Sequence, residues 1–254
     1  MWETGSLHPI LKPEDYQEGS MKTEDINRLA LLIKKYDPYG HLLSVHNRTR
    51  NEQKDYEYDP FIFEAWEDYS TLQGGKSDDM DEVYNFIIDS RKVVKPVYAQ
   101  EVLWYGNIYH ALLDEESLRK KAITLIMAGS FINFGDMNGN SSSGFSGCLD
   151  PDSSHTNAHN TLHKVWDFFD ALPFWELSPR PDLVNGAYCL SDGGGNHLIY
   201  IPDGKPFKLN FNLPSSGQWI NPRDVKSPRI SVSVTDKTIS PPDNNDWFLL
   251  INEK

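Results

Sequence analysis

Short apolar runs alternate with segments of helical period up to about Glu176, and this alternation constrains the fold more than any other feature. Strands that alternate with helices in this way predict a parallel sheet with crossover helices. Function in such sheets gathers at the carboxyl ends of the strands. The expected helices are Thr23–Tyr36, Asp78–Ser90, Glu115–Ala128 and Thr161–Leu172, and the expected strands are His41–His46, Asp68–Gln73, Pro96–Trp104 and Ser130–Phe134.

The pattern changes after Glu176, where short apolar runs are separated by clusters of Gly, Pro, Asn and Asp. Such clusters favour hairpins, so an antiparallel β-sandwich is expected here. We therefore predict an α/β part over residues 1–178 and a β-domain over 179–254, joined at Pro179-Arg180-Pro181. The expected strands of this β-domain are Ala187–Leu190, His197–Ile201, Phe207–Phe211, Ile230–Val234 and Trp247–Ile251.

Charge and cysteine content exclude several classes of protein. The chain carries 37 acidic and 24 basic residues, a net charge of −13, whereas nucleic-acid binding needs a basic footprint. Its 2 cysteines cannot form a disulfide framework or a zinc site. No apolar run approaches membrane length, and no signal peptide follows Met1, which leaves the compartment open. A neutral ligand is therefore the expected partner, with no nucleic acid and no membrane.

Glu101 is the sharpest candidate for chemistry, because a carboxylate inside an apolar strand is costly unless it is paired or faces a cleft. Tyr98, Trp104 and Tyr105 surround it in sequence. Sugar sites combine carboxylates with aromatic faces, since rings stack on the C–H faces of pyranoses. The alternative is a structural ion pair at the end of a strand.

Other polar residues near predicted strand ends are weaker candidates. His46 and Asn47 could bind sugar hydroxyls, or only cap a strand. Asp136 lies in an acidic Gly-rich loop that lacks calcium-loop spacing and reads equally as a turn. The further carboxylates Glu67 and Asp68 follow Trp66, where charged residues are often simply solvated.

Three histidines, His155, His159 and His163, recur every four residues and could face a metal from one side of a helix. No carboxylate completes that set, so no metal site is expected. No Gly-rich phosphate loop follows a strand and no G-x-S-x-G elbow occurs. We therefore expect neither a metal nor an organic cofactor.

The order of these pieces resembles the apiosidase-like glycoside hydrolases over residues 23–252. That family builds a (β/α)₈ barrel followed by a small β-domain to which the label collagen-binding is attached. The motifs that carry the resemblance are Asp37–His46, Trp66–Tyr69 with Gln73, Lys95–Val97 leading to Glu101, Leu198–Gly204, Trp219–Arg223 and Asp246-Trp247.

The resemblance implies roles for particular residues. Glu101 matches the nucleophile position at the end of barrel strand seven, and Trp104 and Tyr105 would offer a stacking surface beside it. His46, Trp66, Asp68 and Gln73 match positions that line the cleft at strands five and six. Strand eight would hold Asn133–Asp136, where only Gly135 agrees with the family's His-Thr-Tyr-Gly-like stretch, so the role of Asp136 is open.

The resemblance also implies that only strands four or five to eight of the barrel are present. The acid/base position at the end of strand four is occupied here by Met1–Gly5, so Glu3 or a residue outside this chain would act as the acid. The chain is thus expected to be a truncated form or C-terminal portion that either self-associates or lacks an N-terminal half.

The expected function is hydrolysis of a glycosidic bond in an oligo- or polysaccharide. One alternative is a non-catalytic carbohydrate- or protein-binding module that carries a decayed half-barrel. Another is a structural arrangement in which two half-barrels pair into one closed barrel. Family members are often secreted or periplasmic, but the sequence itself assigns no compartment.

Overall fold

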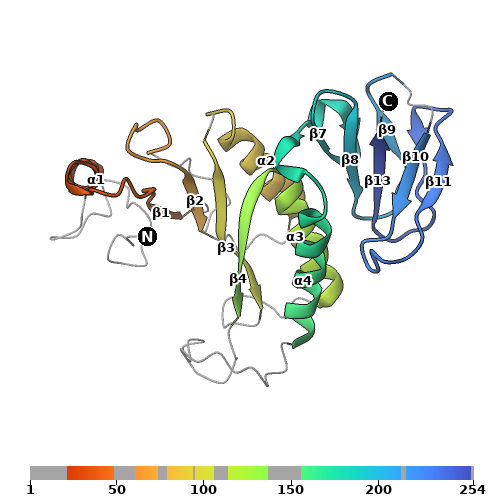
Figure 1. Cartoon of the computed structure of the whole chain (residues 1–254), viewed down its shortest axis with the longest axis horizontal. Helices are drawn as coiled ribbons and strands as arrows, with labels where there is room; N and C mark the ends of the chain where they lie inside the picture. Colours follow the sequence, from red (N-terminus) through yellow and green to blue (C-terminus); the bar gives the residue numbers. More distant parts are fainter. Residues whose placement is uncertain are drawn as a thin grey trace. The chain divides into compact units, whose positions relative to one another are not determined.

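The computed structural model describes residues 22–48, 61–73, 79–93, 95–105, 114–136, 156–212 and 216–252. Packing divides them into two compact units (Figure 1). The first unit contains a parallel sheet with helices α1 (Thr23–Tyr36) and α2 (Met80–Ser90). The second contains α3 (Glu115–Met127), α4 (Thr156–Asp170) and the antiparallel strands. The fold is therefore mixed α/β followed by β structure, as the sequence predicts.

Local side-chain chemistry starts and ends the helices near the predicted residues. Asp79 accepts hydrogen bonds from the backbone N–H groups of Asp81 and Glu82 and so caps α2. Asp114 does the same for α3 through the N–H of Ser117, and this bond lowers the pKa of its carboxyl group. Helix α1 spans the predicted residues, whereas the prediction was wrong at the start of α4, which begins at Thr156 and not at Thr161.

The first unit is built on four parallel strands, β1 (His46–Arg48), β2 (Ser70–Gln73), β3 (Val97–Tyr105) and β4 (Ser130–Asp136). They are neighbours in the order of the chain, β1-β2-β3-β4, and form a curled sheet (Figure 1). Successive strands added on one side are the winding of a (β/α)₈ barrel, whereas a doubly wound sheet reverses its order.

The first strand lies later in the chain than predicted. The expected strand His41–His46 is wrong, since β1 begins at His46. The backbone of Leu43 instead bonds to Asp68, with its N–H 2.6 Å from a carboxylate oxygen and its carbonyl 2.8 Å from the Asp68 nitrogen. A contact with the segment before β2 therefore replaces sheet pairing for these residues.

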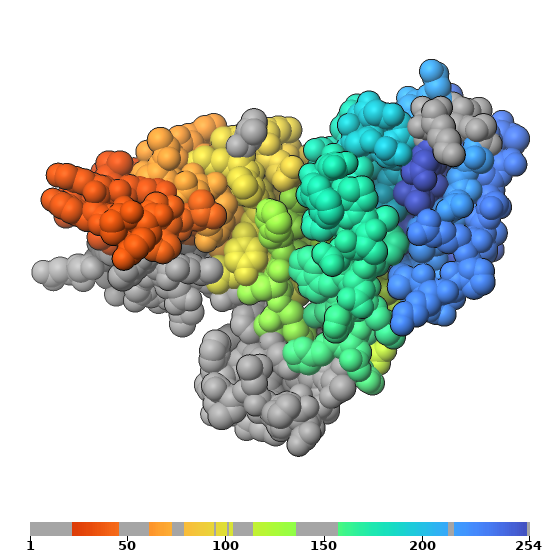
Figure 2. Space-filling model, in the orientation of Figure 1, coloured from red at the N-terminus to blue at the C-terminus, as the bar shows by residue number. Residues whose placement is uncertain are grey.

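Helix α1 is anchored through one apolar stripe. Ile26 and Ala30 are buried in a cluster with Leu43, Val45, Phe61 and Trp66. Its other side exposes apolar residues, among them Leu31, and contributes to the red surface in Figure 2. Among the described residues, no helix is long and apolar enough to cross a membrane.

The second unit contains two antiparallel sheets. The larger has the order β11-β10-β13-β8-β7-β5 and the smaller the order β12-β9-β6. Residues of both sheets share one apolar core, which includes Ile199, Phe207, Leu209 and Leu249. The strands are β5 (Ser178–Pro179), β6 (Val184–Asn185), β7 (Tyr188–Ser191), β8 (Asn196–Ile201), β9 (Phe207–Leu209), β10 (Ser216–Ile220), β11 (Ile230–Ser233), β12 (Thr238–Ile239) and β13 (Trp247–Asn252).

Helix α4 packs within this second unit, although the sequence assigned it to the α/β part. Its Phe168 stacks on Phe248 of β13 with ring centroids 4.5 Å apart. Arg119 of α3 forms a buried ion pair with Asp246, immediately before β13. Packing thus groups α3 and α4 with the β strands. A division of the chain at residues 178/179 into separately folding domains stays a prediction.

Candidate binding face of the parallel sheet

The parallel sheet has one fully buried face and one partly open face. Val97, Ala99 and Ile132 point to the buried face, as the alternation along β3 and β4 requires. Tyr98 and Phe131 are cross-strand neighbours that point the other way. Phe131 is 56% exposed, so this second face is accessible at β4. Accessible aromatic rings in a parallel sheet make this face the candidate site.

A register irregularity interrupts the pairing of β3 with β4. Ala99 pairs with Ile132, and the next pair is Leu103 with Phe134. Three residues of β3, Gln100 to Val102, therefore oppose Asn133 alone. Bulges of this kind redirect side chains and are over-represented next to active sites. Glu101 lies at the centre of this bulge.

Two side-chain oxygens beside the bulge are buried without a partner. Oε1 of Gln100 and Oδ1 of Asn133 have no hydrogen-bond partner within the part of the chain that the structure describes. Each such group costs about 1–3 kcal/mol relative to a bonded one. Both residues are only partly buried as a whole, so they lie near the surface of the candidate face. A ligand or water that donates a hydrogen bond would remove this cost.

The aromatic neighbours of these amides stay uncharged over a wide pH range. Tyr69 contacts Tyr98 edge to face, with ring centroids 6.4 Å apart. Burial, with the charges of Asp68 and Glu67, raises the pKa of Tyr69. Burial and the neighbouring Tyr69 raise the pKa of Tyr98. Both phenols therefore remain hydrogen-bond donors at neutral pH.

The backbone positions of the predicted catalytic region are described, but its side chains are not. Glu101 was expected at the end of a strand, whereas β3 continues to Tyr105. Trp104 pairs with Gly135, and Tyr105 pairs with Asp136. The carboxyl ends of β3 and β4 thus bring these predicted residues side by side in the sheet. Glu3, the predicted acid/base, lies outside the described residues.

The candidates on β1 and β2 also lie in neighbouring strands. His46 pairs with Thr71, and Asn47 pairs with Leu72. Gln73 ends β2, where it pairs with Arg48 at the carboxyl edge. The fold therefore places the backbone of these three residues in the same sheet as Glu101. Their roles stay predictions.

Trp66 and Asp68 lie at the opposite edge, because they precede β2 and so belong to the amino end of the sheet. The indole N–H of Trp66, which is buried, donates to Asn27 over 2.8 Å. Asp68 accepts a 2.5 Å bond from Lys34 as well as the Leu43 N–H. These contacts attach α1 to the sheet. Both side chains therefore have a structural role, and their expected ligand contacts stay a prediction.

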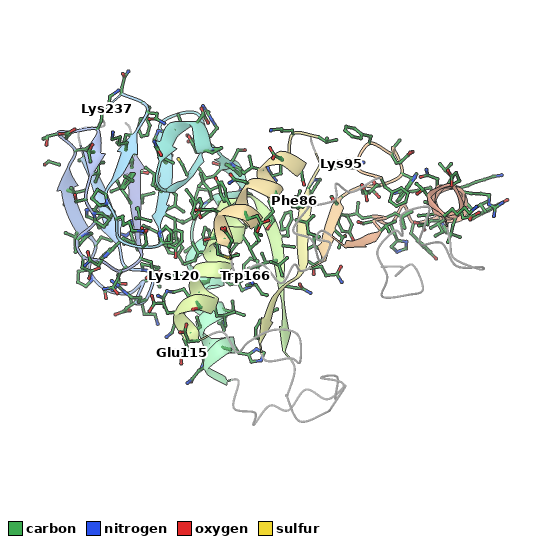
Figure 3. All side chains as sticks on the ribbon, turned by 180° about the vertical axis from the view of Figure 1, so that it is seen from behind. Phe86, Lys95, Glu115, Lys120, Trp166 and Lys237 are labelled. Carbon is green, nitrogen blue, oxygen red and sulfur yellow. The ribbon has the colours of Figure 1, made fainter. Side chains whose placement is uncertain are left out.

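Glu67 is likewise part of this anchor. Its side chain is fully buried, and Lys95 lies 3.8 Å from one carboxylate oxygen and donates to the carbonyl of Glu64 over 2.7 Å. Lys95 lies two residues before β3 and is labelled in Figure 3. The sequence predicts a solvated carboxylate here, and that was wrong, because Glu67 is 1% exposed and lies beside Lys95.

The described residues contain no metal-binding site. No group of three or more His, Cys, Asp or Glu side chains there is placed to hold an ion. His159 and His163 lie on α4, where His163 contacts Asp167 one turn later at 3.1 Å. His155 lies outside the described residues.

Sequence reasoning missed Gln100, Asn133 and Phe131 as members of a site. A signal was present, because Gln100 and Asn133 are polar residues inside otherwise apolar strands. The register irregularity that places both amides in one stretch of the β3–β4 pair exists only in the folded chain.

No family model matches this sequence, and no curated protein matches it. Solved structures are similar over almost the whole chain. One is named "Glycoside hydrolase" and has a TM-score of 0.69 at 18% identity, covering 93% of this chain and 62% of its own. Another is a glycoside hydrolase family 5 protein from Bacteroides vulgatus, with a TM-score of 0.68, 18% identity and coverage of 91% and 60%.

The chain spans about three fifths of the length of both structures. At this identity the likeness concerns the fold, and it includes the parallel sheet as well as the antiparallel strands. The chain therefore shares its fold with part of proteins described as glycoside hydrolases.

Proposed function

We propose that the chain is the C-terminal part of a glycoside-hydrolase barrel of the apiosidase-like kind with its following β-domain. The observation that supports this most is the likeness in fold to glycoside hydrolases over more than nine tenths of the chain. The consecutive order of the four parallel strands agrees with barrel winding. The substrate would be an oligo- or polysaccharide.

In this proposal Glu101 is the nucleophile that attacks the anomeric carbon. Its position within a bulge beside the open face supports the assignment, since bulges aim side chains at active sites. Glu3 or a carboxylic acid outside this chain would protonate the leaving oxygen. A retaining mechanism needs the two carboxyl groups about 5–5.5 Å apart.

The test is Glu101→Gln, which keeps the shape of the side chain and removes its charge. Hydrolysis should fall by several orders of magnitude, because an amide cannot form the glycosyl intermediate. Glu115→Gln, an exposed carboxylate in the first turn of α3, is the matched control and should keep full activity. Equal activity of Glu101→Gln and the wild type would reject the assignment of Glu101 as the nucleophile.

A carbohydrate-binding module without hydrolysis is the second candidate. Exposed Phe131 next to Tyr98 favours it, because stacking on aromatic rings needs no catalytic carboxylate. Oligosaccharide binding in calorimetry by a wild-type chain that hydrolyses no glycoside would support this candidate. Turnover that is lost in Glu101→Gln would reject it.

A further inference from the structure

The bulge between β3 and β4 contains two amide side chains, Gln100 and Asn133, whose oxygens make no hydrogen bond within the described residues. Asn133 is the single β4 residue opposite the three β3 residues Gln100 to Val102, so the two amides belong to the same irregular stretch of the sheet. The buried oxygen of each amide lacks a hydrogen-bond donor within the described ranges. Buried polar groups in native proteins are otherwise almost always bonded. No described residue therefore supplies a hydrogen-bond donor to either oxygen.

The same face carries the two aromatic rings next to the amides. Tyr98 lies two residues before Gln100 on β3, and Phe131 lies two residues before Asn133 on β4. Residues two apart on a strand share a face, and Tyr98 and Phe131 are themselves paired. Two acceptor oxygens thus adjoin an aromatic surface that is open at Phe131.

We propose that Gln100 and Asn133 form a ligand-binding pair that accepts hydrogen bonds from two hydroxyl groups of a neutral sugar unit. The C–H face of that unit lies on Phe131. Sugars supply hydroxyl donors and an apolar face together. An acidic sugar adds a carboxylate, which two acceptor oxygens and a chain with a net charge of −13 would repel, so the pair favours neutral over acidic sugars. This inference rests on the proposed carbohydrate ligand, but it does not require hydrolysis.

The experiment measures binding in the Glu101→Gln background, so that turnover cannot consume the ligand. The probes are cellohexaose, xylohexaose and mannohexaose, with an acidic galacturonic acid oligomer for comparison, in titration calorimetry. At least one neutral probe should bind at least tenfold more tightly than the acidic one. Asn133→Leu and Gln100→Met, which keep the shape and remove the acceptors, should each weaken that binding at least tenfold.

Melting of the ligand-free variants separates this role from a structural one. Removal of an acceptor that has no partner should leave the Tm unchanged or raise it. A clear fall in Tm for both variants would show that the amides hold the fold, and would overturn the proposal. Phe131→Ala changes an exposed ring and should keep the fold but weaken binding. Phe63→Ala changes another exposed ring, outside β3 and β4, and should not weaken binding.

Three other results would overturn the inference. They are no binding of any neutral probe, equal binding of the acidic oligomer, and unchanged binding by both amide variants. A chain that binds neutral sugars through these amides but hydrolyses none would reject the hydrolase proposal and keep the binding pair. The two proposals therefore fail separately.

Discussion

The ion pair between Arg119 and Asp246 is the contact whose loss should be most damaging in the second unit. Arg119 Nε and Nη2 donate to the two carboxylate oxygens over 3.0 and 2.9 Å. The hydroxyl of Tyr200 donates to the same carboxylate over 3.2 Å. The Asp246 side chain is 1% exposed and that of Arg119 is 11% exposed. The bidentate pair therefore joins α3 to the larger sheet in a place almost free of water.

Arg119→Ala removes the cation and leaves the Asp246 carboxylate buried. Burial lowers the pKa of Arg119, but the hydrogen bonds and charge of Asp246 raise it by more, so the guanidinium is charged at neutral pH. Loss of one partner of a buried pair costs about 3–5 kcal/mol. That cost corresponds to a fall in Tm of about 6–20 °C for a unit of this size.

A pair with the same chemistry on the surface provides the control. Arg180 contacts Asp182 through the same two donors, over 2.8 and 2.7 Å, but the side chains are 42% and 60% exposed. Arg180→Ala should cost less than about 1 kcal/mol, because exposed pairs contribute little. Thermal melts followed by circular dichroism would compare the two variants. Equal losses would refute the argument that burial decides the effect.

A compensating variant tests the cause directly. Arg119→Met, Asp246→Leu and Tyr200→Phe together remove the charge, its counter-charge and the hydroxyl. Most of the stability should return, since a buried ion pair can be replaced by apolar groups at little cost. A triple variant as unstable as Arg119→Ala would mean that shape, and not the stranded charge, limits this contact.

Two further predictions concern backbone strain and a buried thiol. Gly204 has a positive φ of 64°, and a Cβ there would overlap the backbone of Asn244. Gly204→Ala should therefore lower the unfolding free energy by more than about 1 kcal/mol in denaturant titrations. Gly194→Ala, the control, should change it by under about 0.5 kcal/mol. Burial raises the pKa of the Cys189 thiol to about 12, so peptide mapping should find it unreacted with iodoacetamide at pH 8 in the native chain and alkylated in denaturant. The thiol ionises near pH 9 in the unfolded chain but only near pH 12 in the folded one. The unfolding free energy should therefore fall as the pH rises from about 9 to 12, because only the unfolded chain loses this proton in that range.

The sequence by itself determined the helices, most strands and the parallel winding of the first part. These follow from local signals: Asp79 and Asp114 cap helices, and the turn after Asp37 ends α1 at Tyr36 because that carboxylate accepts the N–H groups of Tyr39 and His41. Such interactions join residues within a few positions, so they can be predicted without knowledge of the fold.

Strands that depend on their neighbours could not be predicted in this way. β10 (Ser216–Ile220) is mostly polar in sequence, but it lies between β11 and β13 and pairs with both. A residue without a Cβ is favoured at position 217, because a Cβ there would lie 2.8 Å from the side chain of Leu249. The reason for glycine at this position becomes visible only when β13, which is distant in sequence, packs beside β10.

In the candidate site, too, local features could be predicted from the sequence, whereas contacts between distant residues could not. Composition indicated aromatic and carboxylate chemistry around Glu101, since those residues are close in the chain. The bond of Trp66 to Asn27 and the bond of Asp68 to Lys34 join residues 39 and 34 positions apart. Strand register and burial decide such contacts, because they arise only when the whole sheet has formed. The tertiary structure therefore decided which polar residues support the fold and which lie on the candidate face.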